Sequence, residues 1–369
     1  MRSVAVVSAR VVVALSMAAC AAVTGAQAQE RPRERPAPTL GGPLALSDFG
    51  SFFVGGRKVV SDYPGSPAVG FLSPGEITVD QMYVQYMIPA APAGPPLILV
   101  HGFNHTGVTF ETTPDGREGW ATYFVRHGYP VYVVDQPARG RSGFDPTAVN
   151  RAKSTGDAAA LPGIPLYPMK YAFVNFRFGK AYPAPHPGLQ FPLQALDDYA
   201  KELVPSSETT LAGTVTVAPR DLAELLDRIG PAVLLGHSQA GAMVLGAARM
   251  RPGATVALVS IEGDCVPMPP EDVDRVFGKF PFLSVWGDNS EGAEGANGDT
   301  RRNGCAASVK ALRENNGKAE FAMLSEHGMP GHSHMMMMDR GNLAIADFIM
   351  ERLDKNGAPE RFKAISGGR

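Results

Sequence analysis

The segment that most constrains the fold is Leu234–Gly246, which has the sequence LLGHSQAGAMVLG and contains Ser238. The apolar run Ala232–Leu235 has the composition of a buried strand, and small and apolar residues at helical spacing continue to Met250. A sharp turn that carries a serine therefore joins a strand to a helix, which is the layout of a nucleophile elbow. The N-terminus of the helix favours negative charge that develops above the serine.

The match to the usual pattern G-x-S-x-G is incomplete. Ala240 stands where the second glycine is expected, and the glycine is displaced to Gly241. Alanine is still small enough for close packing of helix against strand, so the mechanism survives the substitution. On these residues alone the alternative is an ordinary strand-to-helix turn with a serine cap, and the rest of the chain has to decide.

The composition excludes some classes of function. The chain has 369 residues, 44% of them hydrophobic, and a formal net charge of −2, with no basic cluster. We therefore expect no nucleic-acid binding and no polybasic contact with a membrane surface. The sequence leaves a homodimer open.

The N-terminus has the features of a secretory signal peptide over residues 1–28. Basic residues flank its start, an apolar run covers residues 11–23, and Ala26-Gln27-Ala28 is a small-residue cleavage site. At roughly 13 residues, the apolar run is too short for a membrane-spanning helix. We expect export to the periplasm or the medium, with a Pro-rich leader over residues 29–48.

An alternative to soluble export is lipid anchoring at Cys20. The residues Met17-Ala18-Ala19-Cys20 are similar to a lipoprotein box, but Met17 replaces the usual leucine. The better-formed small-residue site favours soluble export. After cleavage only Cys265 and Cys305 remain, and an even pair in an oxidising compartment suggests one disulfide.

The strand and helix patterns predict one α/β domain over residues 49–369. Residues Phe49–Ser61 suggest a hairpin around Gly55-Gly56, and Ile77–Ile88 suggests another antiparallel strand. From about residue 95, short apolar strands alternate with helices, which is typical of a mostly parallel sheet with helices on both faces. The predicted helices are Gly119–His127, Pro219–Ile229 and Asn342–Leu353, and the predicted strands are Pro95–Val100, Val131–Val134, Thr255–Ile261, Phe280–Trp286 and Glu320–Leu324.

The alternation breaks between about residues 144 and 205. This stretch is crowded with proline, tyrosine and phenylalanine and contains no clean strand pattern. Because a structureless loop of this length is unusual in a compact domain, we expect an inserted cap whose aromatic side chains line a substrate entrance.

A serine nucleophile needs a histidine base, and the base needs an acid. With the chain order serine, acid, histidine, the base should follow the last strand, where His327, His332 and His334 are the candidates. His334 lies farthest into this loop. The alternative, a soft-metal site of His332, His334 and Met335–Met338, is less favoured than core packing of the methionines, so no metal is expected.

Two loops offer the acid. Asp288 ends the strand FLSVWGD, whereas Glu262 and Asp264 end the preceding strand, VSIEGDC. Both loops lie at the correct edge of the sheet, and position alone favours Asp288.

An oxyanion hole requires two backbone N–H donors. Gln239 follows the serine and supplies one, while Phe103 in the loop after LILV is the choice for the other, with Asn104 next.

Several motifs in order resemble a known family. HGFNHTGVTFETTPDGREGW, VVDQPARGRSG, FRFG with QFP, GHSQAG, IEGDCVPMPPEDV and HSHMMMMD are together similar to the Alcaligenes-type esterase group of the α/β-hydrolase superfamily, from about residue 50 to the C-terminus. That group also lacks the second glycine of the elbow. The resemblance implies Glu262 as the acid, with Asp288 as the fallback, His334 as the base, and a disulfide between Cys265 and Cys305.

There is one departure from the family pattern. The best-known member has two adjacent cysteines in the oxyanion loop, where this chain has Phe103-Asn104, so a vicinal disulfide cannot form. The resulting hypothesis is an exported serine carboxylesterase that acts on a small-molecule ester through Ser238, His334 and Glu262 without a cofactor. The alternatives are the same triad on a lactone, amide or polymer ester, or a non-catalytic or metal-binding periplasmic protein.

Overall fold

The computed structural model describes residues 41–61, 74–207, 216–265, 268–291, 298–315 and 317–367. They belong to one compact unit, Pro38–Arg369. The predicted signal peptide, Cys20 and most of the predicted leader lie outside the described residues.

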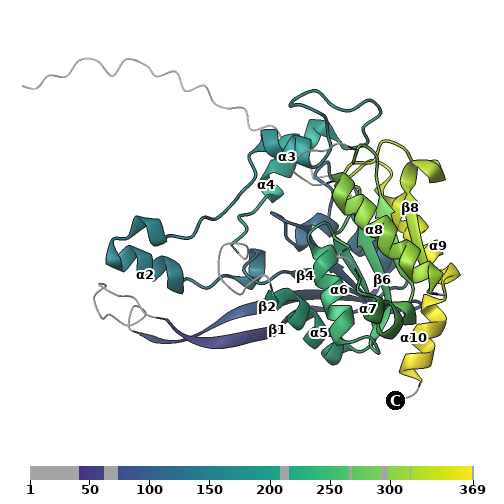
Figure 1. The fold of residues 1–369 in the computed structure, drawn as a ribbon, viewed down its shortest axis with the longest axis horizontal. Helices are drawn as coiled ribbons and strands as arrows, with labels where there is room; N and C mark the ends of the chain where they lie inside the picture. Colours follow the sequence, from purple (N-terminus) through teal and green to yellow (C-terminus); the bar gives the residue numbers. More distant parts are fainter. Residues whose placement is uncertain are drawn as a thin grey trace, which may run out of the picture. The chain divides into compact units, whose positions relative to one another are not determined.

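The described residues build one eight-stranded sheet, with strand order β1-β2-β4-β3-β5-β6-β7-β8 (Figure 1). The pairs β1–β2 and β2–β4 are antiparallel, and every other pair is parallel. The prediction of a mostly parallel sheet opened by antiparallel strands is therefore confirmed. The strands are β1 (Leu46–Ser61), β2 (Gly75–Pro89), β3 (Leu97–Val100), β4 (Val131–Asp135), β5 (Ala232–His237), β6 (Thr255–Ile261), β7 (Phe282–Trp286) and β8 (Ala319–Met323).

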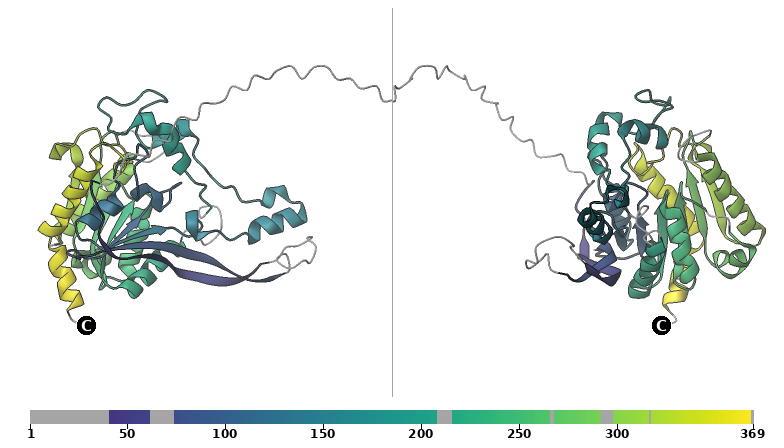
Figure 2. Two further views of the ribbon diagram at one scale, coloured as in Figure 1. Left: turned by 180° about the vertical axis from the view of Figure 1, so that it is seen from behind. Right: turned by 60° about the vertical axis from the view of Figure 1, so that its left-hand side comes forward.

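Helices cover both faces of this sheet, as Figures 1 and 2 show. The central strands β3, β5 and β6 are buried along their whole length, which explains their continuous apolar sequences. Alternate residues of β5 enter two different hydrophobic clusters, one on each face. One cluster includes α1 (Trp120–Arg126), α9 (Asn342–Lys355) and α10 (Ala358–Ser366), and the other includes α5 (Val217–Ile229), α6 (Ala240–Met250), α7 (Pro270–Arg275) and α8 (Gly298–Glu314).

The predicted hairpin at Gly55-Gly56 is wrong, because β1 is one continuous strand that pairs with β2 along its length. Both glycines have positive φ, 67° and 90°. Helix α5 packs against the strand here, and a Cβ on Gly55 would collide with the carboxylate of Asp221. Gly55 serves this close approach and not a chain reversal.

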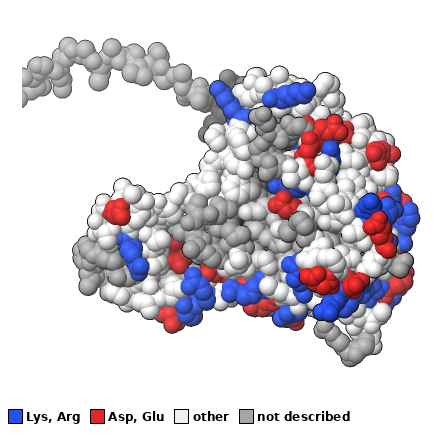
Figure 3. All heavy atoms as spheres, viewed as in Figure 1, with Lys and Arg blue, Asp and Glu red and all other residues white. Residues whose placement is uncertain are grey.

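The segment predicted as a cap, residues 144–205, contains helices α2 (Thr147–Thr155), α3 (Met169–Asn175) and α4 (Leu196–Glu202) and no strand. In Figures 1 and 2, α3 and α4 lie together, apart from α2, which lies near the far ends of β1 and β2. An ion pair of 3.6 Å between Arg57 and Asp145 links β1 to the chain just before α2. Acidic and basic side chains are interspersed on the face seen in Figure 3.

Candidate active site

Ser238 occupies the turn between β5 and α6. Its φ of 55° is in the left-handed region, and its side chain is almost completely buried, with 7% of the residue exposed. The N–H of Ser238 donates to the Ile261 carbonyl at 2.9 Å, and its own carbonyl accepts from Gly241 at 2.9 Å. A strained backbone held by hydrogen bonds on both sides is what a nucleophile elbow requires.

The structure explains why alanine is tolerated at position 240. The closest backbone approach in this turn is made by Gly241, where a Cβ would lie 2.5 Å from the N atom of Asp264. The methyl group of Ala240 is buried in the core without such a conflict. The position that needs glycine is therefore one residue later than in the usual pattern.

Glu262 and His334 form a buried pair next to His237, the residue before Ser238. Glu262 Oε2 is 2.6 Å from His334 Nδ1, and both side chains are buried. The second carboxylate oxygen of Glu262 accepts the N–H of Gly287 at 2.8 Å. The ring of His237 donates from Nε2 to the His334 carbonyl at 2.9 Å, which links the elbow to the histidine loop. A carboxylate on Nδ1 fixes the tautomer that leaves Nε2 able to accept a proton.

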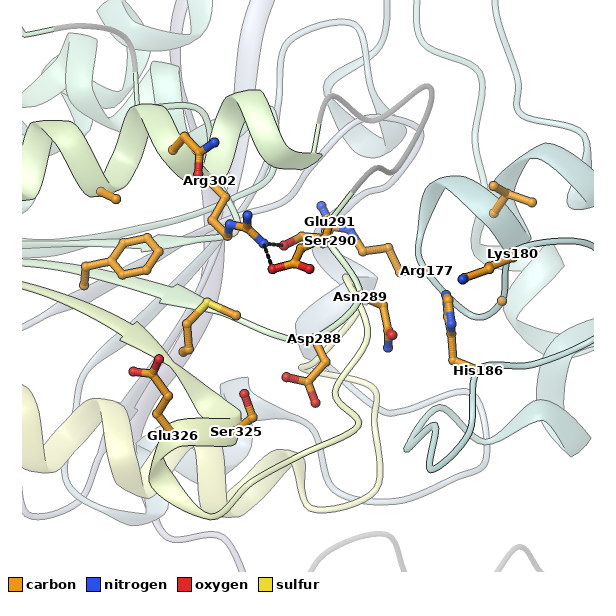
Figure 4. A pocket seen from close by; sticks show the side chains of 16 residues that line it. Arg177, Lys180, His186, Asp288, Asn289, Ser290, Glu291, Arg302, Ser325 and Glu326 are labelled. Atoms are coloured by element: carbon orange, nitrogen blue, oxygen red, sulfur yellow. Dashed lines mark hydrogen bonds and ion pairs between the residues drawn. The ribbon is translucent and has the colours of Figure 1, made fainter.

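Asp288, which position alone favoured as the acid, has other partners. Its carboxylate accepts the Gly331 N–H at 2.6 Å, and its own N–H donates to the His332 carbonyl at 3.0 Å. It lines a cavity of about 960 Å³, shown in Figure 4, together with Arg177 and Arg302. Among the described residues that line this cavity, neither Ser238 nor His334 appears. Asp288 thus holds the loop that leads to His334.

The remaining histidines of the loop have structural contacts. His332 Nδ1 lies 3.1 Å from Asp339 Oδ2, and the ring of His327 packs on Phe348 at 4.9 Å. Met335–Met338 are all buried in the core. Within the described part of the chain, no three His, Cys, Asp or Glu side chains come together as metal ligands.

Phe176 and Arg177, which the sequence reasoning missed as site residues, enclose the histidine from the 144–205 segment. The Phe176 carbonyl accepts the His334 N–H at 3.1 Å. Arg177 Nη1 contacts Glu262 Oε2 and lies 3.4 Å from His334 Nδ1. Both residues belong to the motif FRFG, one of the motifs that carry the family resemblance, but the motif by itself does not indicate a function for either residue.

The histidines around the elbow are shifted toward the neutral form. Burial is the main reason why the pKa of His334 lies well below its ordinary value, and the charges of His237 and Arg177 act in the same direction. Burial also lowers the pKa of His237 to about 3 and that of His105 to about 4. Arg177 is affected too, since burial and the nearby Arg301 lower its pKa to about 9. A neutral imidazole at position 334 is the form that can accept a proton.

The two predicted oxyanion donors belong to the serine turn and to a loop that contacts it. Gln239 precedes α6, and Phe103 lies in the loop after β3. A Cβ on Gly102 would lie 2.9 Å from Ser238 Cβ, so this loop packs directly on the nucleophile. Buried Arg139 donates to the Gly102 carbonyl at 3.1 Å and to Gln239 Oε1 at 3.3 Å, which joins the two donor segments.

The backbone N–H of Asn104, the second choice for the donor, is bonded elsewhere, because it donates to Ser206 Oγ at 3.1 Å. Its side-chain amide donates to the carbonyls of Pro165 and Val204, each at 2.9 Å, and its Oδ1 accepts the Tyr167 N–H at 2.9 Å. These bonds tie the oxyanion loop to the 144–205 segment.

Two further features involve helix α8. Cys265 and Cys305 form a disulfide that joins the loop after β6 to helix α8. From the same helix, Arg301 Nη1 reaches within 3.3 Å of Ser238 Oγ. No sequence pattern pointed to Arg301.

A mostly parallel sheet that carries a serine on a left-handed turn, with a buried histidine–carboxylate pair in contact with the residue before that serine, is typical of an α/β hydrolase. The chain belongs to the alpha/beta hydrolase family, whose profile matches residues 97–310. It is of the esterase and lipase type.

Two relatives are similar over most of the chain. A solved structure described as a novel bacterial esterase is 41% identical, covers 86% of this chain and 98% of its own, and superposes with a TM-score of 0.79. The probable secreted lipase phiG of a fungal species (strain ATCC 74256) is 28% identical over an alignment of 332 residues, which covers 74% of this chain and 86% of that protein. Among the described residues, no helix is long and apolar enough to cross a membrane.

Proposed function

We propose that this protein is a serine carboxylesterase in which Ser238, His334 and Glu262 form the catalytic triad. The observation that carries the proposal is the 2.6 Å contact between the buried Glu262 carboxylate and Nδ1 of His334, whose backbone carbonyl accepts a hydrogen bond from His237 of the serine turn. The names of the two relatives, an esterase and a lipase, support the same chemistry.

The reaction proceeds in two balanced halves. Ser238 Oγ attacks the ester carbonyl carbon while its proton passes to His334 Nε2, and the tetrahedral oxyanion accepts hydrogen bonds from the N–H groups of Gln239 and Phe103. The carbon–oxygen bond of the ester then breaks, and the leaving alkoxide takes the proton from His334. Water attacks the acyl-enzyme by the same route and releases the acid and the free serine. Glu262 stabilises the imidazolium that forms in each half.

The 144–205 segment acts as a cap in this proposal. Tyr167 of this segment lies 5.0 Å, ring to ring, from Phe103 of the oxyanion loop. Together with Phe176 at the histidine, these contacts make the segment one wall of the site.

Export is the second part of the proposal. The signal-like residues 1–28, the disulfide and the relative named as a secreted lipase all support it. N-terminal sequencing of the mature protein from the periplasm or medium should start at Gln29, whereas a lipid-modified Cys20 would contradict soluble export.

The test of the triad is covalent labelling. A fluorophosphonate should label the wild-type protein at Ser238 and abolish hydrolysis of short acyl esters, and Ser238→Ala should lose both labelling and turnover. Retention of ester hydrolysis in Ser238→Ala would contradict the proposal. A panel of esters, lactones, amides and polyesters then identifies the acyl bond that is cleaved fastest.

A further inference from the structure

Arg301 places a guanidinium at the nucleophile that the proposed hydrolysis does not need. Its Nη1 lies 3.3 Å from Ser238 Oγ, and only 17% of its side chain is exposed. The triad supplies the base, and two backbone N–H groups serve the oxyanion. A neutral ester can accept a hydrogen bond from this cation but offers it no opposite charge, so its placement calls for a different explanation.

The surroundings hold Arg301 in this position. Its Nε lies 2.5 Å from Asp264 Oδ1, and the N–H of Asp264 donates to the Ser238 carbonyl at 3.1 Å. The disulfide between Cys265 and Cys305 adds a second link, because Cys305 lies one helical turn after Arg301 and Cys265 follows Asp264. The ion pair and the disulfide therefore connect α8 to the loop after β6 at two neighbouring points.

The contacts of Arg301 leave part of its hydrogen-bonding capacity for a ligand. A guanidinium has five N–H donors in a planar fork that matches a carboxylate. Asp264 and Ser238 account for contacts at Nε and Nη1, and the Asp264 side chain is itself 41% exposed. Burial raises the pKa of the Tyr167 phenol, in the 144–205 segment, to about 12, and the positive charge of Arg301 partly offsets this rise. The cation is thus placed at the serine by its contacts with Ser238 and Asp264.

We propose that Arg301 binds an anionic group of the substrate, so that the preferred substrates are esters with a free carboxylate a short spacer away from the scissile carbonyl. Half-esters of dicarboxylic acids are the matching chemical class. The carboxylate pairs with the guanidinium fork as the carbonyl carbon meets Ser238, and this pairing orients the ester. The inference rests on the proposed function and adds the identity of its substrate class.

The experiment compares two esters that differ only in charge. Monomethyl succinate carries a carboxylate, and methyl succinamate carries a neutral amide of the same shape. We expect the wild-type protein to have the larger kcat/KM for monomethyl succinate, and this preference should weaken at high salt. In Arg301→Gln, the ratio of the two kcat/KM values should fall roughly ten- to a hundredfold, the range for a hydrogen bond to a charged group. Arg301→Lys keeps the charge without the fork and should give an intermediate ratio.

The matched control is Arg302→Gln. Arg302 is the next residue of α8, has the same 17% side-chain exposure, and bonds Ser290 and Asp299 instead of Ser238. It should keep the wild-type ratio. An equal loss for both esters in Arg301→Gln would assign Arg301 to the reaction itself and overturn the proposal, as would a wild-type protein without preference for the charged ester. Failure of the proposed function is distinguishable, because the wild-type protein would then hydrolyse neither ester and would not be labelled at Ser238 by the fluorophosphonate; a labelled protein that hydrolyses neither ester would overturn the substrate proposal alone.

Discussion

The ring of Phe176 lies parallel to the imidazole of His334, with an angle of 1° between the planes and 5.6 Å between the centroids. The same residue accepts the backbone N–H of His334. The 144–205 segment therefore contacts one face of the proposed base and its backbone, while Glu262 contacts Nδ1. This arrangement makes the segment part of the site's rigid structure.

Phe176→Leu should reduce turnover more than it reduces stability. The smaller side chain keeps most of the apolar contact, so we expect a loss of about 1–2 kcal/mol in the free energy of unfolding. The imidazole loses its parallel neighbour, and kcat should fall roughly tenfold. Phe191→Leu is the matched control, because Phe191 is buried in the same aromatic cluster and stacks on Phe178 instead of His334. Equal kcat losses in the two variants would contradict a positioning role for Phe176.

Glu262→Gln should lower kcat/KM for a short acyl ester by about a hundredfold or more, because an amide cannot stabilise the imidazolium. Asp288→Asn should stay within about tenfold of wild type, since Asp288 bonds the backbone of Gly331. Glu262→Gln also leaves Arg177 buried without its carboxylate, so a thermal melt must show that the variant is folded at the assay temperature. If Asp288→Asn lost activity and Glu262→Gln did not, the catalytic acid would be Asp288 and not Glu262.

Gly102→Ala should damage the site without unfolding the chain. A methyl group there would lie 2.9 Å from Ser238 Cβ and 3.1 Å from His237 Nδ1, so the elbow or the oxyanion loop must shift. A displacement of this kind costs about a hundredfold in kcat/KM. Gly163→Ala meets no heavy atom within 4 Å and should behave as wild type. Near-normal kcat/KM in Gly102→Ala would show that the loop adapts freely.

Asp221→Asn should stabilise the protein in mild alkali. Burial raises the pKa of Asp221 to about 7, above the value of about 3.9 expected for the unfolded chain. The folded state therefore binds more protons between these values, and its stability falls as the pH rises from about 4 to about 7. Asparagine removes this loss, so the gain in the free energy of unfolding should be about 1–2 kcal/mol at pH ~8 and smaller at pH ~5.

The control for this pH effect lies on the same helix. Asp227 is exposed, and its pKa is lowered by the hydrogen bond to Arg251. Asp227→Asn should therefore be neutral or slightly destabilising at pH ~8. Denaturant unfolding of both variants at the two pH values checks the signs, and a gain in Asp221→Asn that does not depend on pH would contradict the mechanism.

Local pattern was sufficient for much of the fold. Short continuous apolar runs predicted the buried strands β5 and β6, and the serine turn lies between one such run and a helical pattern. The hairpin predicted at Gly55 was wrong for a local reason, because a glycine needed for close approach of α5 has the same signature as one needed for a turn.

The choice between the two carboxylates was not a local matter. Glu262 and Asp288 end neighbouring parallel strands at the same edge of the sheet, so strand position cannot separate them, and the family resemblance pointed to Glu262. In the structure, Glu262 has a left-handed backbone, with φ of 46°, and its carboxylate contacts His334. The carboxylate of Asp288 instead accepts the N–H of Gly331, three residues before His334.

The sequence by itself determined the α/β layout, the serine on its turn and the histidine loop, because these depend on residues that are neighbours in the chain. Phe176, Arg177 and Arg301 reach the site from segments far from Ser238 in sequence, and only the tertiary structure decided that they meet there. Their contacts depend on how loops and helix α8 pack over the sheet edge, and no periodicity in the sequence records that packing.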